Sequence, residues 1–279
     1  MKRKIFIVLM LLFYFKLTFT NMRVLSLTLG GDELLLGLGM KNSMVGVCGE
    51  IVDNPRYSNI VGKTFGEKRV NGNLEEIAFL HPDLVIVADW MSKDKIDHLE
   101  KMGINLLKYK TPNSFEELFS LIDSFNKKME IGEKAIEINS DIKNRIENVK
   151  IRARNIKKKK RVLLYTSYGS TCGEGTFFDD ISKIANFENI ASKNGIAGNV
   201  KISKEKIVQF NPEIIIVPIY EESEKKLVIN NFLNDKSLEN IDAIKNKKII
   251  TIEDKHLMTS SQHMINSLEI IFNKIYSKI

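Results

Sequence analysis

The stretches NLEEIAFLHPDLVIV, at residues 73–87, and SKEKIVQFNPEIIIV, at residues 203–217, repeat one pattern at a constant offset of 130 residues. Each stretch begins with a residue that commonly caps helices, continues with helical spacing of apolar side chains, reaches a proline and ends in branched apolar residues. Proline stops a helix, and a strand that is buried on both faces is apolar throughout. The pattern therefore predicts, in both places, a short helix followed by a buried parallel strand.

The repeat extends beyond these two stretches. A similar apolar strand opens each half of the chain, with the sequence RVLSL from Arg23 and RVLLY from Arg161. Within the repeated stretches, the matching residues are the caps Asn73 and Ser203, the first-turn acids Glu75 and Glu205, and the prolines Pro82 and Pro212. Matches that recur in the same order indicate a duplication, and we predict two lobes of one design.

Between the two halves, the sequence predicts long helices. Residues 114–129 have helical spacing behind an N-cap serine, and residues 131–157 contain no proline and a single glycine, Gly132. A helix as long as the second segment would extend roughly 40 Å. We therefore expect a rigid connecting helix here, and a final amphipathic helix over about residues 261–276.

Strands that alternate with helices in both halves predict an α/β fold with two Rossmann-like parallel-sheet lobes joined by one long rigid helix. Ligands of such sheets bind at the carboxyl ends of the strands, so we expect a ligand cleft between the lobes. The expected division is a signal peptide at 1–20, an N-terminal α/β lobe at 21–129, a connecting helix at 130–159 and a C-terminal α/β lobe at 160–279.

The start of the chain has the layout of a secretory signal peptide. Basic residues at 2–4 precede an apolar run at 5–15, and the small residues Thr18 and Thr20 precede a cleavage point near Asn21. The apolar run is short for a bilayer span, although an uncleaved N-terminal anchor is the alternative. Because no cysteine follows the run closely, we predict a periplasmic protein without a lipid anchor.

The charge of the chain excludes one class of partner. Four of the 42 basic residues lie in residues 1–20, which hold no acid, so 38 basic residues stand against 35 acidic ones in the remainder. A nucleic-acid-binding protein keeps a basic face in its folded part. We therefore expect no nucleic-acid partner.

Four motifs are arranged around the long helix: RVLSLTLGGDELLLGLG at 23–39, NLEEIAFLHPDLVIV at 73–87, GTFFDDISKIANFENIA at 175–191 and KISKEKIVQFNPEIIIVP at 201–218. In this order they resemble the substrate-binding proteins of ABC importers for iron-siderophores, haem and vitamin B12, the class III periplasmic binding proteins. The resemblance implies capture of a ferric chelate, a corrinoid or haem and its delivery to a transmembrane permease dimer with ATPase subunits. It implies no intrinsic cofactor and no catalysis.

The resemblance also implies that one surface glutamate on each lobe docks onto arginines of the permease. The matching positions are Glu75 and Glu205, which the duplication makes equivalent. A glutamate in the first turn of a helix also complements the helix dipole, by ~0.3–1 kcal/mol. That alternative explains one glutamate better than it explains a matched pair.

The ends of the predicted strands indicate which side chains meet the solute. Trp90 directly follows a buried strand, where it either stacks on a flat or greasy ligand or caps the core of its own lobe. Tyr168 and Tyr220 are similar candidates from the opposite lobe. The predicted cleft loops are 28–32, 48–53, 89–91 and 109–112 in the first lobe, and 166–174, 218–221 and 253–259 in the second.

Sulfur and imidazole side chains are further ligand-binding candidates. Cys48 and Cys172 each begin a Cys-Gly-Glu tripeptide at a predicted strand end. They share a soft metal, form a disulfide or, by default, remain unpaired and partly buried thiols. Haem or metal ligation requires a Tyr, His, Met or Cys side chain, and His256 and Met258 lie in a predicted cleft loop.

Three other classes of function stay open. A binding protein for an oxyanion or a free metal ion would place a buried cation or a His/carboxylate cluster in the cleft, and Arg56 and Lys63 are weak candidates for the cation. A chelatase-type enzyme has similar paired lobes, and a structural surface protein would bind no small molecule. Residues 29–33 do not form G-x-G-x-x-G, and the Walker, G-x-S-x-G and H-E-x-x-H motifs are absent, so we predict no enzyme.

Overall fold

The two repeated stretches form the same unit twice in the computed structural model, which describes residues 22–276. In the first unit, the Asn73 side chain caps its helix by accepting hydrogen bonds from the backbone N–H groups of Glu75 and Glu76. In the second, Ser203 occupies the equivalent cap position. The units are α3 (Leu74–Phe79) with β4 (Leu84–Ala88), and α9 (Lys204–Phe210) with β10 (Ile214–Ile219). The predicted helix-proline-strand repeat is confirmed.

Each repeated strand lies beside the strand that opens its half of the chain, and all strands of each main sheet are parallel. In the first lobe, Val24 lies opposite Leu84, and in the second Val162 lies opposite Ile214. The first sheet has the order β3-β2-β1-β4-β5 and the second β11-β10-β6-β8. The other strands of these sheets are β1 (Val24–Ser26), β2 (Met44–Cys48), β3 (Arg69–Val70), β5 (Leu106–Tyr109), β6 (Arg161–Leu164), β8 (Glu188–Asn189) and β11 (Ile249–Glu253).

The second lobe also contains an antiparallel ribbon that the sequence did not predict. It pairs β7 (Ser170–Cys172) with β9 (Asn199–Lys201), and the predicted cleft loop 166–174 contains its first strand. Periodicity is a weak signal over so few residues, and the pairing joins segments far apart in the sequence. The ribbon adds a piece to the second lobe that the first lobe lacks.

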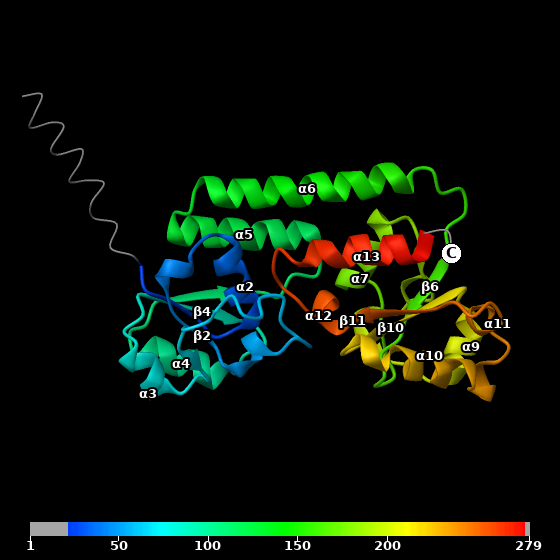
Figure 1. Ribbon diagram of the computed structural model, residues 1–279, viewed down its shortest axis with the longest axis horizontal. Coiled ribbons are helices and arrows are strands. Elements are labelled where there is room, and N and C mark those ends of the chain that lie inside the picture. Colours follow the sequence, from blue (N-terminus) through cyan, green and yellow to red (C-terminus); the bar gives the residue numbers. More distant parts are fainter. Residues whose placement is uncertain (1–21, 277–279) are drawn as a thin grey trace, which may run out of the picture.

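A layer of helices runs along one side of both sheets (Figure 1). It contains α5 (Phe115–Met129), capped by Ser114, together with α6 (Glu133–Ala153) and α13 (Met264–Tyr276). The connecting helix α6 has 21 residues, which correspond to roughly 31 Å. The predicted length, 131–157, is wrong at both ends. Gly132 takes a positive φ just before the helix begins, and Arg154 would face Lys158 one turn further on, a like-charge pair that destabilises helix.

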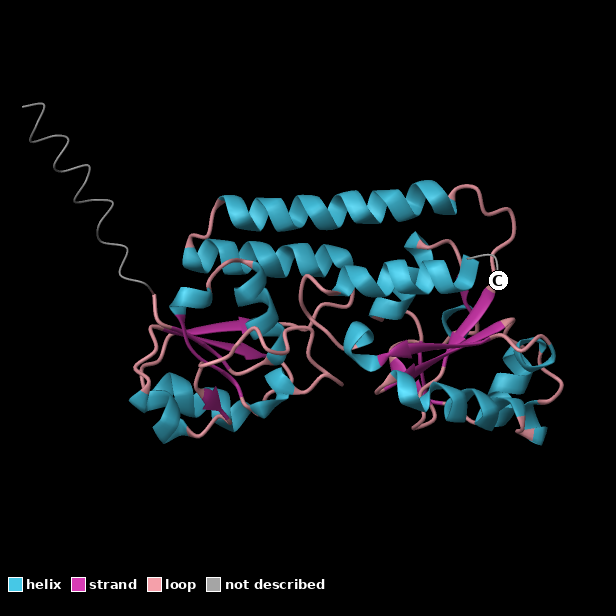
Figure 2. Ribbon diagram, in the orientation of Figure 1, coloured by secondary structure: helices cyan, strands magenta, loops and turns pink. Residues whose placement is uncertain are grey.

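Three further helices, α2 (Leu29–Gly37), α7 (Phe177–Ile184) and α12 (Asp254–Leu257), pack against the same core as the helical layer. The opposite faces of the two sheets are covered by α3 and α9 together with α4 (Lys93–Lys101), α8 (Ile190–Lys193), α10 (Lys225–Leu233) and α11 (Asp242–Lys245). The two sets of strands remain separate beneath the helical layer (Figure 2). Short 3₁₀ turns occur at Lys41–Ser43, Glu50–Asp53, Glu222–Glu224 and Lys236–Leu238. No helix within residues 22–276 combines the length and the apolar character that crossing a bilayer requires.

The apolar core is shared between the lobes on one side and divided on the other. One cluster contains Ile86 of β4, Phe125 of α5, Ile146 of α6 and Ile216 of β10, so it continues from one sheet to the other beneath the helical layer. The opposite face of each sheet has a core of its own. The lobes are therefore held at a fixed spacing by close packing along the helical layer. The predicted signal peptide at 1–20 lies outside the described residues.

Candidate binding site

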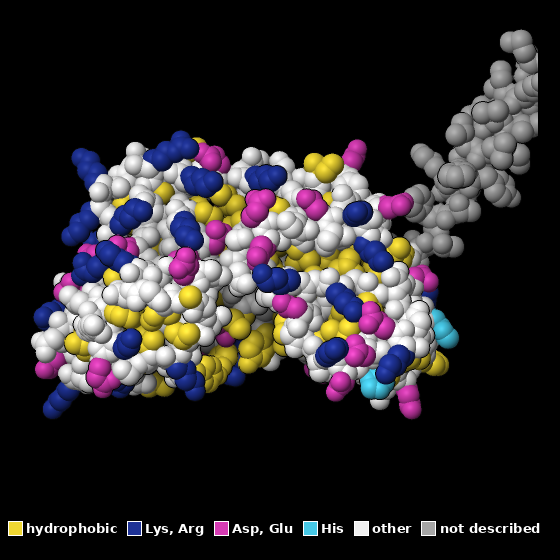
Figure 3. Space-filling view, turned by 180° about the vertical axis from the view of Figure 1, so that it is seen from behind, with side chains coloured by type: hydrophobic (Ala, Val, Ile, Leu, Met, Phe, Trp, Pro, Cys, Tyr) yellow, Lys and Arg dark blue, Asp and Glu magenta, His cyan; other side chains and the backbone are white. Residues whose placement is uncertain are grey.

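A cavity of about 230 Å³ is lined by residues from the carboxyl ends of both sheets. The first lobe contributes the turn after β5, at Thr111, Pro112 and Asn113. The second lobe contributes most of the wall, from the ends of β6, β10 and β11 and from the ribbon, with Thr166, Cys172, Phe177, Pro218, Asp254, Met258 and Thr259 among its residues. Hydrophobic side chains gather where the two lobes meet (Figure 3).

A second cavity, of about 170 Å³, adjoins the first on the side of the C-terminal lobe. Tyr168 and Tyr220 line it, and Asp254 and Met258 belong to both cavities. The side chains of Tyr168 and Met258 are 68% and 74% exposed, so both present their surfaces to the space between the lobes. Three predicted ligand-binding residues, Tyr168, Tyr220 and Met258, therefore lie together.

A tight turn places Tyr168 at this position. The backbone N–H groups of Gly169 and Ser170 donate to the carbonyl and hydroxyl oxygens of Thr166. Gly169 has a φ of +81°, in the region that residues with a Cβ rarely adopt. The turn directs Tyr168 towards Tyr220, and the two phenol hydroxyls are in direct hydrogen-bonding contact. This hydrogen bond raises the pKa of Tyr220 to about 12.

A loop of the first lobe reaches across to the same tyrosines. Arg56 forms an ion pair of 2.6 Å with Glu221, and the Tyr57 ring packs edge-on against Tyr220 with 6.0 Å between the ring centres. The sequence pointed to Arg56 only as an oxyanion ligand and did not indicate Tyr57. Arg56 and Tyr57 lie in a turn, outside any helix or strand. The periodicity of the sequence therefore could not predict which way their side chains point.

The buried carboxylate of Glu33, in α2, joins both walls of the interlobe region. One oxygen accepts from the backbone and side chain of Asn59 at 3.0 and 2.9 Å, and the other accepts from Thr259 and Ser261 at 2.5 and 2.6 Å. The segment around Ser260 passes so close to α2 that a Cβ at Gly30 would overlap its side chain. We did not expect this role for Glu33. The sequence did contain one indication, because glycines such as Gly30 occur where another segment of the chain packs closely against a helix.

Trp90 follows β4 in a turn, as predicted, and it is 65% exposed. That exposure contradicts the alternative in which Trp90 caps the core of its lobe. The repeat offset of 130 residues places Trp90 at the position equivalent to Tyr220, but Trp90 lines neither of the two cavities at the lobe interface. Its contact with solute remains a prediction.

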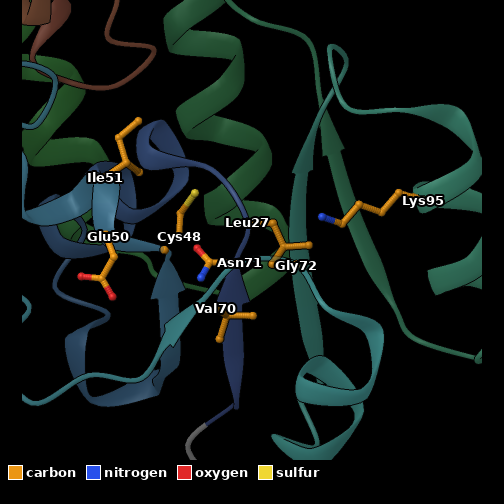
Figure 4. A pocket seen from close by; sticks show the side chains of 9 residues that line it. Leu27, Cys48, Glu50, Ile51, Val70, Asn71, Gly72 and Lys95 are labelled. Atoms are coloured by element: carbon orange, nitrogen blue, oxygen red, sulfur yellow. The ribbon is translucent and has the colours of Figure 1, made fainter.

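The two cysteines line different cavities. Cys172 faces the interlobe cavity, whereas Cys48 lines a separate cavity of about 170 Å³ inside the first lobe, into which Lys95 extends (Figure 4). Both thiols are free and half-buried, and the structure does not bring them together in a disulfide or a shared metal site. Burial raises the pKa of Cys48 to about 12, with a contribution from nearby Asp32, and the pKa of Cys172 to about 11. Both thiols therefore stay protonated at neutral pH.

His256 does not line either cavity between the lobes. It lies in α12, where its Nε2 atom is 3.9 Å from Glu253 and its backbone carbonyl accepts from Ser267. Burial, followed by the charge of Lys255, lowers the pKa of the ring. The structure thus separates His256 from Met258, which the sequence had grouped with it.

The structure was also compared with the requirements of a site for a free metal ion or an oxyanion. Within residues 22–276, no group of three or more His, Cys, Asp and Glu side chains is placed to hold a metal ion. Arg56 and Lys63 are both exposed, so neither supplies the buried cation that an oxyanion site would require. A larger cavity of about 530 Å³ lies at the amino ends of β10 and β11, away from the predicted residues.

Glu75 and Glu205 occupy matched positions on the two lobes. Each is exposed in the first turn of its helix, and neither carboxylate has an ion-pair partner among the described residues. The charged residues next to them in the sequence do form ion pairs, Glu76 with Lys68 and Lys204 with Asp235. A hydrogen bond from Ser203 lowers the pKa of Glu205, which keeps this carboxylate charged.

Solved structures with the same fold cover most of the chain. A possible iron-binding (periplasmic solute-binding) protein from Staphylococcus epidermidis has 23% identity and a TM-score of 0.80 over 92% of this chain and 99% of that chain. The periplasmic heme-binding protein HutB of Vibrio cholerae has 22% identity and a TM-score of 0.76, over 92% and 100%. The molybdate-binding protein MolA of Haemophilus influenzae has 17% identity and a TM-score of 0.74, over 91% and 86%.

At these identities the similarity establishes the fold. No curated protein sequence gives a significant match. The family described as Periplasmic binding protein matches residues 24–256, which include both repeated units and most of the residues around the interlobe cavity. The chain therefore belongs to the periplasmic binding protein family.

Proposed function

We propose that this protein is the extracytoplasmic solute-binding component of an ABC importer and that it captures a ferric siderophore, a corrinoid or haem between its lobes. Its family implies an extracytoplasmic location, and the basic and apolar start of the chain supports export by a cleaved signal peptide. The partners are a transmembrane permease dimer and its ATPase subunits.

The observation that carries the proposal is the interlobe cavity. Parallel sheets bind ligands at the carboxyl ends of their strands, and here the ends of two sheets line one cavity. The adjoining cavity adds the exposed aromatic and thioether surfaces of Tyr168, Tyr220 and Met258. Together the two cavities form a partly apolar site, which suits a bulky metal complex with a flat or greasy face better than a small ion.

The side chains around the two cavities are consistent with binding and release of the solute without a chemical reaction. The thiol of Cys172 has a raised pKa, so it is a poor nucleophile at neutral pH. The half-buried His256 lies outside both cavities, where it is not placed to transfer a proton to a bound solute. We therefore assign no catalytic residue. For the chelatase alternative, the candidate bases in the cavity walls are the carboxylates of Asp254 and Glu224, and Glu224 already accepts a hydrogen bond from the backbone N–H of Tyr220.

Docking to the permease is assigned to Glu75 and Glu205. Both carboxylates are exposed and unpaired within the described part of the chain, whereas adjacent charged residues form ion pairs with neighbours. Two such carboxylates on duplicated lobes match a permease dimer that presents one cationic site from each subunit. An exposed carboxylate adds to the rate and specificity of association through its charge.

The first experiment tests capture. Purified protein is titrated by calorimetry with haem, a corrinoid and several ferric siderophores, and Trp90 fluorescence is followed in parallel. We expect saturable binding of about one equivalent of one member of the panel. Saturable binding only of molybdate or of a free divalent cation would replace the proposed solute class, and binding of none would contradict capture altogether.

The second experiment tests docking. The variant carrying Glu75→Ala and Glu205→Ala should bind solute with wild-type affinity and fail to support uptake through its permease. Glu76→Ala is the matched control, because Glu76 is adjacent in sequence and already paired with Lys68. Uptake at the wild-type rate by the double variant would show that these glutamates do not dock.

A further inference from the structure

Two basic segments meet at the outer end of the C-terminal lobe. Residues 157–161 connect α6 to β6, and residues 245–248 connect α11 to β11. Eight of these nine residues are lysine or arginine, the exception being Asn246. Because β6 and β11 flank β10 in one parallel sheet, both segments lie at the edge where the strands begin (Figure 1). We call the two segments together the basic end.

The two segments share one hollow in the surface. The cavity of about 530 Å³ at the amino ends of β10 and β11 is lined by lysines of both segments, Lys160, Lys247 and Lys248. Two acids also line it, but Glu213 and Asp242 are both already paired with Arg161. The other lysines of the basic end have no ion-pair partner within residues 22–276, and most of them are exposed.

The small net charge of the protein conceals this local excess. Of the 42 basic residues, four lie in residues 1–20 and Lys278 follows the described part, which leaves 37 against 35 acidic residues in 22–276. Eight of the 37 belong to the basic end, so the rest of the described chain holds 29 basic against 35 acidic residues. Figure 3 shows the dark blue Lys and Arg side chains gathered at this end of the C-terminal lobe, on the left. One end of an otherwise acidic molecule therefore attracts an anionic surface and orients the protein towards it.

The chemistry of the basic end favours a lipid bilayer over nucleic acid as that surface. Seven of its eight cations are lysines, whose ammonium groups act as point charges, whereas nucleic-acid recognition favours arginine. Neither segment contains an aromatic residue that could stack on bases. The family of the chain is extracytoplasmic, and its proposed permease lies in a membrane.

We propose that the basic end binds reversibly to the anionic headgroups of the membrane that contains the permease. The proposal rests on the proposed function for this location and does not depend on which solute is captured. Clusters of about four to eight lysines and arginines bind anionic bilayers, and each cation near the surface strengthens binding roughly fivefold. Such binding keeps the protein close to the bilayer without a lipid anchor and raises its effective concentration at the permease.

The test uses the mature form of the protein, which begins near Asn21, and two kinds of vesicle. One kind contains phosphatidylcholine alone, and the other contains equal parts of phosphatidylcholine and phosphatidylglycerol. At low ionic strength the protein should sediment with the anionic vesicles and not with the neutral ones. Added salt should release it, because salt screens exposed charges. A protein that stays in solution with both kinds of vesicle would overturn the proposal.

A triple variant assigns the binding to the basic end. Lys157→Gln, Lys159→Gln and Lys247→Gln together remove three exposed lysines without an ion-pair partner in the described part of the chain. The partition onto anionic vesicles should decrease by about 100-fold. Thermal unfolding measured on the same variant checks that the lobe remains folded.

A second triple variant separates the basic end from the net charge. Lys41→Gln, Lys93→Gln and Lys127→Gln remove three exposed lysines of the N-terminal lobe, which also have no ion-pair partner among the described residues. The change in net charge is identical, but the partition should decrease by less than about threefold, because these charges lie outside the contact and are screened. Equal losses in the two triple variants would overturn the proposal.

Solute binding and membrane binding can fail separately. Calorimetry should give the basic-end variant the wild-type solute affinity, because none of its three substitutions lies in the interlobe cavities. If vesicle binding depends on the basic end but no solute binds, membrane binding stands and capture is wrong. If a solute binds but the protein ignores anionic vesicles, capture stands and the membrane proposal is wrong. Tighter binding to a DNA duplex than to anionic vesicles at the same salt concentration would overturn the choice of partner.

Discussion

The two lobes share a framework and differ in the segment that comes after their first strand. In the N-terminal lobe, Thr28 lies just beyond β1 and caps α2 directly, by accepting from the N–H of Gly31. In the C-terminal lobe, Thr166 lies beyond β6 at the equivalent place, but its hydroxyl accepts from Ser170 in the turn that begins the ribbon. The second lobe thereby gains Tyr168. A short ribbon beside an otherwise equivalent strand changes the surface of the site and leaves the sheet intact.

The lobes also differ in how they use polar groups near the cavity. The N-terminal lobe buries Glu33 with four hydrogen bonds to its carboxylate, which hold the loops on both sides. The C-terminal lobe instead leaves phenols, a thioether and a carboxylate exposed to the cavity. This difference indicates a division of roles, in which the first lobe positions the walls and the second contacts the solute.

The largest expected effect tests the shared framework. Ile86 and Ile216 occupy equivalent positions in β4 and β10, and both are fully buried in the core that spans the lobes. Replacing either by alanine should lower the free energy of unfolding by about 2–5 kcal/mol, because the lost side chain leaves a cavity. Urea denaturation of Ile86→Ala and Ile216→Ala measures both. As a control, Leu227→Ala at an exposed position should change the free energy of unfolding by less than about 0.5 kcal/mol. A similarly small change at either isoleucine would contradict the conclusion that the two lobes share an equivalent core position.

A smaller effect tests the positioning role of the N-terminal lobe. Glu33→Gln keeps the size of the side chain but places an amide N–H₂ group against hydroxyls that donate to the carboxylate. We expect a loss of about 1–3 kcal/mol in unfolding free energy, together with weaker solute binding, although Glu33 lines neither interlobe cavity. Glu116→Gln, on the exposed side of α5, is the control. Unchanged stability and affinity in Glu33→Gln would refute the positioning role.

The next prediction concerns pH and Asp32, beside Glu33 in α2. Burial raises the pKa of Asp32 well above its usual value, and one of its oxygens is buried without a partner. Above about pH 4 the unfolded chain releases this proton while the folded protein retains it, so stability decreases as pH rises through that range. The variant Asp32→Asn keeps an acceptor for the N–H of Cys48 but has no carboxyl group that can lose a proton. Its free energy of unfolding relative to wild type, measured by urea denaturation at a series of pH values, should increase from about pH 4 upward. A constant difference between the two proteins over this range would contradict the raised pKa of Asp32.

The smallest effect concerns the ion pair between the lobes. Arg56 and Glu221 are each about half exposed, so a double-mutant cycle with alanine at both positions should give a coupling of about 0.2–1 kcal/mol. The coupling should decrease with added salt. The pair Lys68–Glu76, within the first lobe, provides a matched cycle. A coupling above about 2 kcal/mol at Arg56–Glu221 would contradict the expectation that this exposed pair adds little to the packing of the helical layer.

Local signals predicted the regular elements well. Asn73 and Ser114 cap the helices that begin after them, and the apolar runs after Pro82 and Pro212 are central strands. These features depend on residues a few positions apart, whose conformational preferences are local and do not require the rest of the chain to be folded. The ends of α6 were mispredicted because the apolar periodicity continues beyond them, although Gly132 and the like-charged Arg154 and Lys158 lie at the points where the helix ends.

The candidate site was predicted in part. Tyr168, Tyr220 and Met258 meet at one cavity, but Cys48 faces another, His256 turns towards Glu253, and Trp90 lines neither interlobe cavity. Glu33 and Tyr57 were missed, because their partners lie far away in the sequence. A strand end indicates which loop approaches the site, but the direction of a side chain within that loop depends on long-range contacts.

The sequence by itself determined the duplication, the parallel α/β lobes, the helical connection and the matched positions of Glu75 and Glu205, because periodicity, capping and offset are properties of the chain. The tertiary structure alone decided which side chains share a cavity, that the turn before the ribbon brings Tyr168 to Tyr220, and that one buried carboxylate joins both walls. The physical reason is that burial and hydrogen-bond satisfaction are settled between distant segments only when they pack.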